Sequence, residues 1–441
     1  MRRVAAAALL ALPALLAFGR GGYFAVARLR GAVLAWALAG VAAVIAERPL
    51  PRARPGRLVL AGMAALTAWV GLSALWAPEA GPAFADFERL LLYLGALVAG
   101  IALLRDFDWT EPAILATTVL AAVYGLSERL LPWLVSLQRL PSAGDRLAQP
   151  LTYWNAEGAL AALGLVLAAG LAAQGRRRWV VAAAPLLGLD LYLTLSRGAI
   201  GAALAGLAVV AALVPTKAGL RAVLVVGVSA ALAALAALAL PDLQHVRGST
   251  GQGALMIGIL VVLGAAAAFA VRGADGPLPH LRRLAAGALA VLLVGTVVAA
   301  ATGGHEGAVN SGRANRLVSV QSNRYAYWKV AVKVFADHPV AGVGSGGFAV
   351  EWLKRRPFAE GVRDAHSLYL ETLAELGLAG AVFLGVLIAG VVLACRGGPP
   401  AAVAAIVAFG LHAGLDWDWE MPALSLCALL LVARLAALRE R

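Results

Sequence analysis

Residues 366–395 read HSLYLETLAELGLAGAVFLGVLIAGVVLAC, a short polar opening followed by a long apolar run. From residue 368 onward the run is long enough to cross the roughly 30 Å hydrocarbon core of a bilayer as one α-helix. The segment before it, 302–367, is polar and charged, although most of the chain is apolar. A membrane helix that emerges from a long polar loop is therefore the pattern from which we predict the fold.

The chain has 441 residues, of which 61% are hydrophobic and 14% charged, whereas soluble domains are about a quarter charged. Apolar runs recur at 4–19, 32–46, 58–76, 90–104, 112–126, 156–173, 179–195, 198–214, 222–240, 254–271, 284–301, 368–395, 401–415 and 421–438. The region 179–214 is too long for one crossing and is expected to turn near Ser196 to Gly198. We predict an all-α fold, a polytopic membrane helical bundle with about 12–14 transmembrane helices and one long extracytoplasmic loop.

The net charge of +13 does not indicate nucleic-acid binding, because the Lys and Arg residues lie between the apolar runs. Their excess in one alternate set of short loops predicts cytoplasmic termini and an extracytoplasmic 302–367 segment. Cys395 and Cys427 each lie in an apolar run and indicate neither a disulfide framework nor a metal site. The predicted segments are N-terminal helices at 1–150, a central membrane region at 151–301, the loop 302–367 with an amphipathic helix, and C-terminal helices at 368–441.

A lone arginine stands between two apolar runs in TLSRGAIG, residues 194–201. An arginine in hydrocarbon costs at least about 2.5–3.5 kcal/mol, so its position needs a reason. Arg197 is either a turn residue that extends to the headgroups or an anion-binding residue that faces a cavity.

A second arginine begins SNRYAYWKVAVKVFADHPVAGVGSGGF, residues 322–348. On a helix, Arg324 shares a face with Trp328, Ala331 and Phe335, and the opposite face carries lysines 329 and 333. Arg324 is thus either directed toward protein or lipid, or a first-turn residue at a frayed helix end. The glycines that follow have GxGxxG spacing, but no βαβ unit surrounds them, so we predict a tight re-entrant turn rather than a dinucleotide site.

His366 is the first residue of the segment 366–395. On one continuous helix, Gly377 and Gly380 would share its stripe, and small residues there would admit a neighbouring helix. His366 is either an interfacial histidine at a helix start, with Asp364 as the N-cap, or a base, since imidazole accepts a proton near physiological pH.

Polar residues also gather in FGLHAGLDWDWEMP, residues 409–422. His412 and Asp416 are four residues apart and are expected to hydrogen-bond on one helical face. Paired carboxylates can bind metal, but aspartates beside tryptophans more often mark the membrane boundary. We favour a boundary with a supporting role for His412 and Asp416.

These motifs resemble the O-antigen ligase and polymerase superfamily. His366, Ser367, Gly377 and Gly380 match its pattern of His, then Asn, Ser or Gln, nine residues, Gly, two residues and Gly. The resemblance extends to the Arg324 segment, to LTLSRGAIGA at 193–202, to TYWNAEGALAA at 152–162 and to HAGLDW at 412–417, and so covers roughly residues 150 to 440.

The resemblance implies a membrane glycosyltransferase of the C-type fold in the bacterial cytoplasmic membrane. Such enzymes transfer a glycan from undecaprenyl diphosphate, at the outer face, to a hydroxyl of a glycolipid, glycan or protein, without a cofactor, metal or nucleotide sugar. It implies that Arg197 and Arg324 bind the diphosphate and that His366 is the catalytic base. Supporting positions are Asn155, Tyr369, Gly377, Gly380, His412 and Asp416.

Ligase and polymerase cannot be separated on these residues, because both would use the same donor. A flippase or transporter for lipid-linked glycans is a different class, and it would require charges near the membrane midplane. A non-catalytic assembly partner is a third. The charges here cluster in one long loop and at one face, which favours chemistry at a membrane surface.

Overall fold

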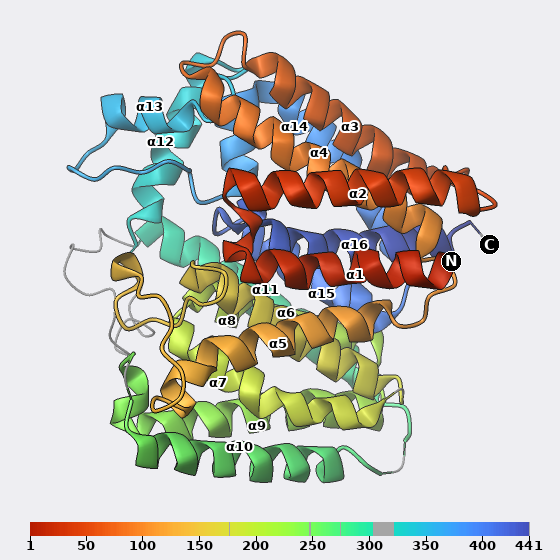
Figure 1. The fold of residues 1–441 in the computed structure, drawn as a ribbon, viewed down its shortest axis with the longest axis vertical. Helices are drawn as coiled ribbons and strands as arrows, with labels where there is room; N and C mark the ends of the chain where they lie inside the picture. Colours follow the sequence, from red (N-terminus) through yellow and green to blue (C-terminus); the bar gives the residue numbers. More distant parts are fainter. Residues whose placement is uncertain (176, 247, 274, 303–321, 441) are drawn as a thin grey trace.

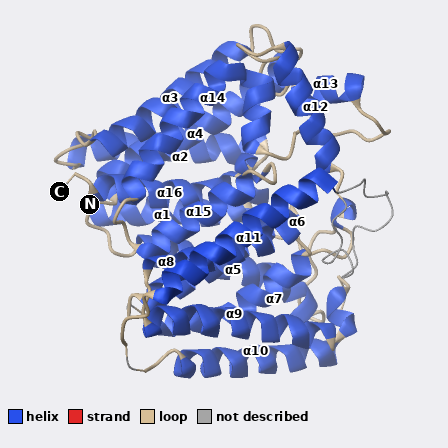
Figure 2. Ribbon diagram, turned by 180° about the vertical axis from the view of Figure 1, so that it is seen from behind, coloured by secondary structure: helices blue, strands red, loops and turns tan. Residues whose placement is uncertain are grey.

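The computed structural model describes residues 1–175, 177–246, 248–273, 275–302 and 322–440, and this part of the chain is built from helices without a strand (Figure 2). The α-helices are α1 (Arg2–Phe18), α2 (Ala25–Ile45), α3 (Arg54–Ser73), α4 (Ala80–Leu103), α5 (Thr110–Leu130), α6 (Trp154–Ala173), α7 (Ala184–Thr194), α8 (Arg197–Leu213), α9 (Lys217–Leu238), α10 (Thr250–Ala270), α11 (His280–Thr302), α12 (Arg324–Asp337), α13 (Phe348–Arg355), α14 (Leu368–Cys395), α15 (Pro400–Ala413) and α16 (Pro422–Leu438). Short 3-10 helices are η1 (Arg20–Gly22), η2 (Pro141–Ala143), η3 (Arg178–Ala183), η4 (Pro241–Gln244) and η6 (Asp418–Glu420). The predicted all-α class is confirmed.

Each predicted apolar run contains one α-helix, and η3 precedes α7 in the run 179–195. Helix α12 corresponds to the predicted amphipathic helix, and α13 was not predicted. Of the described helices, 8 are long and apolar enough to cross a membrane, while α8, α15 and α16 are apolar but shorter. The predicted turn between α7 and α8 is present, with Leu195 in the left-handed region and Ser196 as the N-cap of α8. The chain is therefore a polytopic helical membrane protein.

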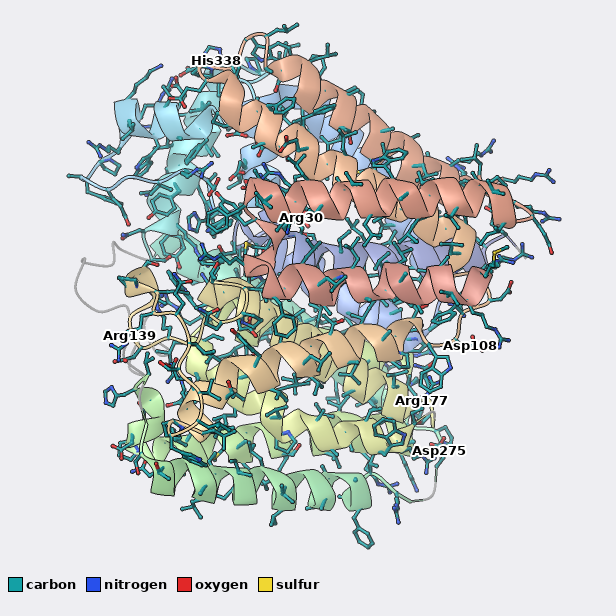
Figure 3. The ribbon with its side chains drawn as sticks, in the orientation of Figure 1. Arg30, Asp108, Arg139, Arg177, Asp275 and His338 are labelled. Atoms are coloured by element: carbon teal, nitrogen blue, oxygen red, sulfur yellow. The ribbon has the colours of Figure 1, made fainter. Side chains whose placement is uncertain are left out.

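The helices lie side by side, and their connecting loops gather at two opposite ends of the bundle (Figure 1). Both termini lie at one end, together with Asp108, Arg177 and Asp275, and Arg139 and His338 lie at the other (Figure 3). Successive loops alternate between the ends as a polytopic topology requires. Which end faces the cytoplasm stays a prediction, and residues 303–321 of the predicted outer loop lie outside the described residues.

Helix α6 occupies the centre of the bundle, where it contacts α5, α7, α8, α9 and α15. Small residues allow the backbones to approach closely. A Cβ built on Gly170 of α6 would come within 2.4 Å of the Ala401 Cα, and one on Gly62 of α3 within 2.4 Å of the Leu387 backbone nitrogen. Van der Waals packing of this kind holds membrane helices together where the hydrophobic effect between them is weak.

Helices α12 and α13 form a small second core at the end opposite the termini (Figure 1). Its largest buried side chains are Tyr327 of α12 with Phe348 and Trp352 of α13, and α12 also packs on α14. Lys329 and Lys333 are exposed on the far face of α12, as the helical spacing predicted. This packing directs the first residue of α12, Arg324, toward the bundle.

Candidate functional site

The backbone around His366 differs from the continuous helix that we predicted. Helix α14 begins at Leu368, its N-cap is Ser367 rather than Asp364, and His366 precedes it in the left-handed region with φ +55°. Gly377 interrupts the helical geometry with φ +63°. The predicted stripe of His366, Gly377 and Gly380 is therefore wrong, because the chain is not helical at two of these three positions.

A glycine-rich turn packs against the break at Gly377. Gly342 and Gly344 have positive φ, which few residues other than glycine adopt readily. A Cβ built on Gly377 would lie 2.4 Å from the Val340 carbonyl oxygen, and one on Gly380 would lie 2.3 Å from the Leu376 Cβ. The predicted tight turn is present, and glycine is needed at 377 because of this loop rather than because of a neighbouring helix.

Asp416, which is fully buried, connects three segments that are distant in sequence. Its Oδ1 accepts a hydrogen bond of 2.7 Å from the Tyr153 hydroxyl, and its Oδ2 pairs with the Arg324 guanidinium. Asn155 donates from Nδ2 to the Tyr153 oxygen at 2.7 Å. Burial favours the neutral acid, but Arg324 and the nearby histidines outweigh burial and hold the pKa of Asp416 below its usual value. An ionised carboxylate thus fixes the position of Arg324.

His412 does not pair with Asp416, so that expectation is corrected. Helix α15 ends at Ala413, and the His412 Nδ1 lies 2.5 Å from Oδ2 of Asp418. Both side chains are buried, and the His412 Nε2 has no hydrogen-bond partner in the described part of the chain. The pair is enclosed, which suits a supporting role.

His366 lies in the loop before α14, and its ring is 5.2 Å from the ring of Tyr327 on α12, the helix that begins with Arg324. Its Nδ1 lies 2.9 Å from the carbonyl oxygen of Asp364. Since a carbonyl only accepts, Nδ1 carries the proton and Nε2 presents its lone pair. Burial lowers the pKa of His366, with a further decrease from Arg324 and an opposing increase from Asp416. The ring is therefore neutral at physiological pH and is able to accept a proton.

Arg197 is the first residue of α8 and is half-buried. The next residue brings this helix end to the cluster, because a Cβ on Gly198 would lie 3.2 Å from the His412 Nε2 and 3.9 Å from Nη1 of Arg324. Backbone N–H groups at the start of a helix favour anions. The structure thus places the predicted Arg197, Arg324, His366, Asn155, His412 and Asp416 at one end of the bundle.

Tyr369 lies on the first turn of α14 and is 39% exposed. Its hydroxyl donates to the Gly410 carbonyl at 2.7 Å, and its ring lies beside Gly414. It lines a large apolar cavity next to the cluster rather than contacting Asp416.

Two glutamates of α14, to which the sequence assigned no role, hold neighbouring loops: Glu371 binds the His366 loop and Glu375 binds the glycine-rich turn. Glu371 accepts 2.6 Å from the Ala365 N–H, and Glu375 accepts from the N–H groups of Gly346 and Phe348 at 2.9 and 3.0 Å. Glutamates in the first turns of α14 give no local signal of these backbone partners. Tyr153 was also missed, although it lies in the 152–162 motif from which Asn155 was selected.

A possible cation-binding group is formed by Asp364, Glu371 and Glu420, whose oxygens come within 4.8 Å of one another. Glu420 pairs with Arg89 at 3.0 Å, and Glu371 is bound to the backbone. Burial, together with the charge of Glu420, raises the pKa of Asp364 well above its usual value. These contacts favour an anchoring role for the group.

Residues 243–385 match a family model described as O-antigen ligase. The matched segment includes Arg324, His366, Gly377 and Gly380, whereas Arg197 and Asp416 lie outside it. No curated protein shows significant similarity to the chain. The match at residues 243–385 supports an assignment to the O-antigen ligase and polymerase superfamily.

Proposed function

We propose that the protein transfers a glycan from undecaprenyl diphosphate to an acceptor hydroxyl at the extracytoplasmic face of a bacterial cytoplasmic membrane. The observation that carries this proposal is the position of His366 and Arg324 around the buried Asp416, beside the start of α8. A proton acceptor and a cation in one cluster are what transfer from a diphosphate leaving group requires.

The proposed reaction forms one bond and breaks one. The acceptor oxygen attacks the anomeric carbon, its proton moves to the His366 Nε2, and the bond from the anomeric carbon to the diphosphate oxygen breaks. Positioned bases of this kind contribute about 10²–10⁴ in rate. Undecaprenyl diphosphate leaves with the bonding electron pair.

Arg324 and Arg197 are proposed to bind the diphosphate, as the resemblance implies. Charge-assisted bonds from guanidinium to phosphate are strong, and they stabilise the negative charge that develops on the leaving group. Asp416 acts as a positioning residue, because it holds Arg324 from a buried site. We propose that this electrostatic stabilisation replaces a metal, so that chelators leave the rate unchanged.

The apolar cavity beside the cluster suits the isoprenoid chain of the donor. It has a volume of about 660 Å³ and is lined by residues of α8, α11, α14, α15 and α16. Leu368 and Tyr369 at its wall follow directly after the His366 loop. A chain bound there would keep its head group beside Arg324.

The test is transfer by purified protein supplied with a carrier-linked glycan. Arg324→Gln is expected to weaken donor use by about 10²–10³-fold, which is typical for the loss of one electrostatic donor. Lys333→Gln, on the exposed face of the same helix, is the matched control. Unchanged donor affinity in Arg324→Gln would refute the diphosphate role, and absence of undecaprenyl diphosphate release by the wild type would favour a transporter.

The acceptor class is distinguished in a deletion strain. Loss of long chains from the acceptor, with polymer accumulating on the carrier, identifies a ligase. Single-repeat glycans identify a polymerase. The description of the matched family favours the ligase.

A further inference from the structure

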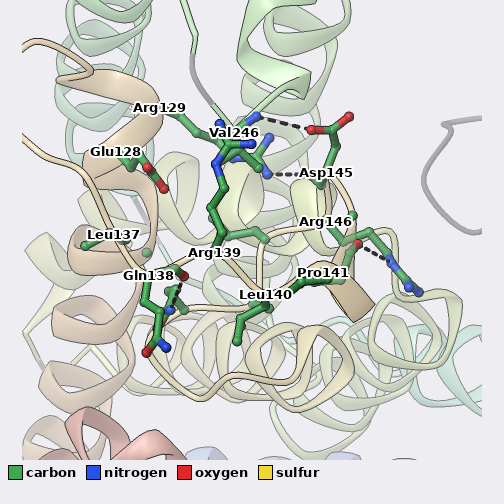
Figure 4. A pocket seen from close by; sticks show the side chains of 16 residues that line it. Glu128, Arg129, Leu137, Gln138, Arg139, Leu140, Pro141, Asp145, Arg146 and Val246 are labelled. Atoms are coloured by element: carbon green, nitrogen blue, oxygen red, sulfur yellow. Dashed lines mark hydrogen bonds between the residues drawn. The ribbon is translucent and has the colours of Figure 1, made fainter.

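A second cavity is formed by the segment that joins α5 to α6 (Figure 4). This segment lies at the same end of the bundle as the candidate site (Figure 1). Its volume of about 400 Å³ falls within the range of about 300–1,000 Å³ typical of small-molecule sites. The walls come from the end of α5, from residues 137–149 and from Val246. None of the proposed donor-binding or catalytic residues lines it.

One wall carries a largely buried carboxylate next to the charge of Arg129. Glu128, on the last turn of α5, is only 8% exposed, and its oxygens point into the cavity (Figure 4). Within the described residues it makes no hydrogen bond or ion pair. Because these oxygens are open to the cavity, a donor group of a ligand can hydrogen-bond to them.

A guanidinium extends across the same cavity from the opposite wall. Arg139 lies on the connecting segment, runs toward Val246 (Figure 4), and has no hydrogen bond or ion pair with the described residues. The two neighbouring arginines are occupied instead. Arg129 donates to the carbonyl oxygens of Leu243 and Asp145, and Arg146 donates to that of Ala143. Those bonds fix the walls and leave Arg139 to bind a ligand.

We propose that this cavity binds a short, uncharged saccharide. Sugar hydroxyls donate and accept hydrogen bonds at once, so they satisfy Glu128 as donors and Arg139 as acceptors. An anionic ligand would be repelled by Glu128, and a cationic ligand would be repelled by Arg139. An apolar ligand would leave both side chains without hydrogen-bond partners. This inference rests on the proposed function, because the saccharide would be part of the glycan of either the donor or the acceptor.

The cavity wall is continuous with the candidate site. The Arg146 guanidinium stacks 3.5 Å from the Trp154 ring, which lies 4.9 Å from the ring of Tyr153, the partner of Asp416. The Leu147 N–H donates 2.9 Å to the Leu193 carbonyl, four residues before the N-terminal residue of α8. A saccharide in the cavity therefore lies against the elements that carry the reacting groups.

The test compares Glu128→Gln and Arg139→Ala with the control pair Glu47→Gln and Arg48→Ala, two exposed residues in another loop. The probe is the soluble oligosaccharide released by mild acid from the host's own lipid-linked glycan. Its binding to the full chain in detergent is measured by saturation-transfer NMR. We expect at least about a tenfold weaker affinity in each cavity variant and unchanged affinity in the controls.

Transfer kinetics identify the source of the sugar. A raised KM for the carrier-linked glycan assigns the cavity to the donor, and a raised KM for the acceptor assigns it to the acceptor, in both cases with kcat retained. No binding by the wild type, or equal binding by wild type and both variants, overturns the proposal. If binding depends on Glu128 and Arg139 but the protein transfers no glycan, the saccharide site is supported and the proposed function is refuted. If transfer is normal and both variants keep the wild-type KM and binding, the proposed function is supported and the saccharide site is refuted.

Discussion

Two histidines at the same end of the bundle have opposite environments. His412 is 1% exposed, and its Nδ1 is bound to the Asp418 carboxylate in the turn between α15 and α16. His366 is half-buried on a loop, and its Nδ1 is bound only to a backbone carbonyl. The first arrangement encloses the ring between protein groups. In the second, burial lowers the pKa of the ring and keeps it neutral, and we propose that its Nε2 accepts the proton of an incoming hydroxyl. The difference teaches that the exposure of the ring and the partner of its Nδ1, rather than the residue type, distinguish a candidate base from a structural histidine.

The comparison predicts its largest effect at His366. We expect His366→Ala to lower the transfer rate by about 10²–10⁴-fold while expression is retained, because the ring accepts the proton and makes few structural contacts, a ring contact with Tyr327 and a hydrogen bond to a backbone carbonyl among them. His338→Ala, an exposed histidine that follows α12, is the control and should transfer normally. Normal transfer by His366→Ala would refute the assignment of the base.

A smaller effect is expected at Asp416, the carboxylate that binds both Tyr153 and Arg324. Asp416→Asn removes the charge that fixes Arg324, and hydrogen bonds to charged groups are worth about 1.5–3 kcal/mol, so donor affinity should fall about 10- to 150-fold. Asp416 also raises the pKa of His366. The acid limb of the pH profile should therefore move to lower pH in this variant, and an unmoved limb would show that Asp416 acts on structure alone.

The enclosed histidine should affect stability more than chemistry. His412→Ala leaves the buried Asp418 without its partner, which is expected to cost about 1–3 kcal/mol. Thermal unfolding in detergent measures this cost, with the exposed His245→Ala as the control. If His412→Ala kept full stability and lost transfer, the roles of the two histidines would have to be exchanged.

The helical spans and the exposed face of α12 followed from local sequence patterns. Hydropathy marks the apolar helices because side chains in hydrocarbon must be apolar, and such runs are helical because lipid cannot satisfy free backbone groups. The 3.6-residue period correctly placed Lys329 and Lys333 away from the bundle. Such signals are carried within each helix. They do not depend on the rest of the fold.

The errors arose where a helix was assumed to continue. His366 and Gly377 were placed on one stripe, but Gly377 leaves the helical region to fit the loop at Val340. His412 was paired with Asp416 by spacing, although α15 ends between them and Asp418 becomes the partner. The break at Gly377 depends on the contact with the distant loop at Val340. The end of α15 is a local feature instead, because Gly414 is its C-cap, and glycine often ends helices.

The central claim is that a neutral His366 takes the proton of the acceptor, and the pH dependence of kcat/KM tests it most directly. Burial lowers the pKa of His366 from its ordinary value of 6.5. The imidazole is unprotonated above its pKa, so the rate should rise with pH through a single step below pH 6.5 and then stay constant to about pH 8. A rate without an acid limb, or a step that lies above pH 6.5, would contradict the account.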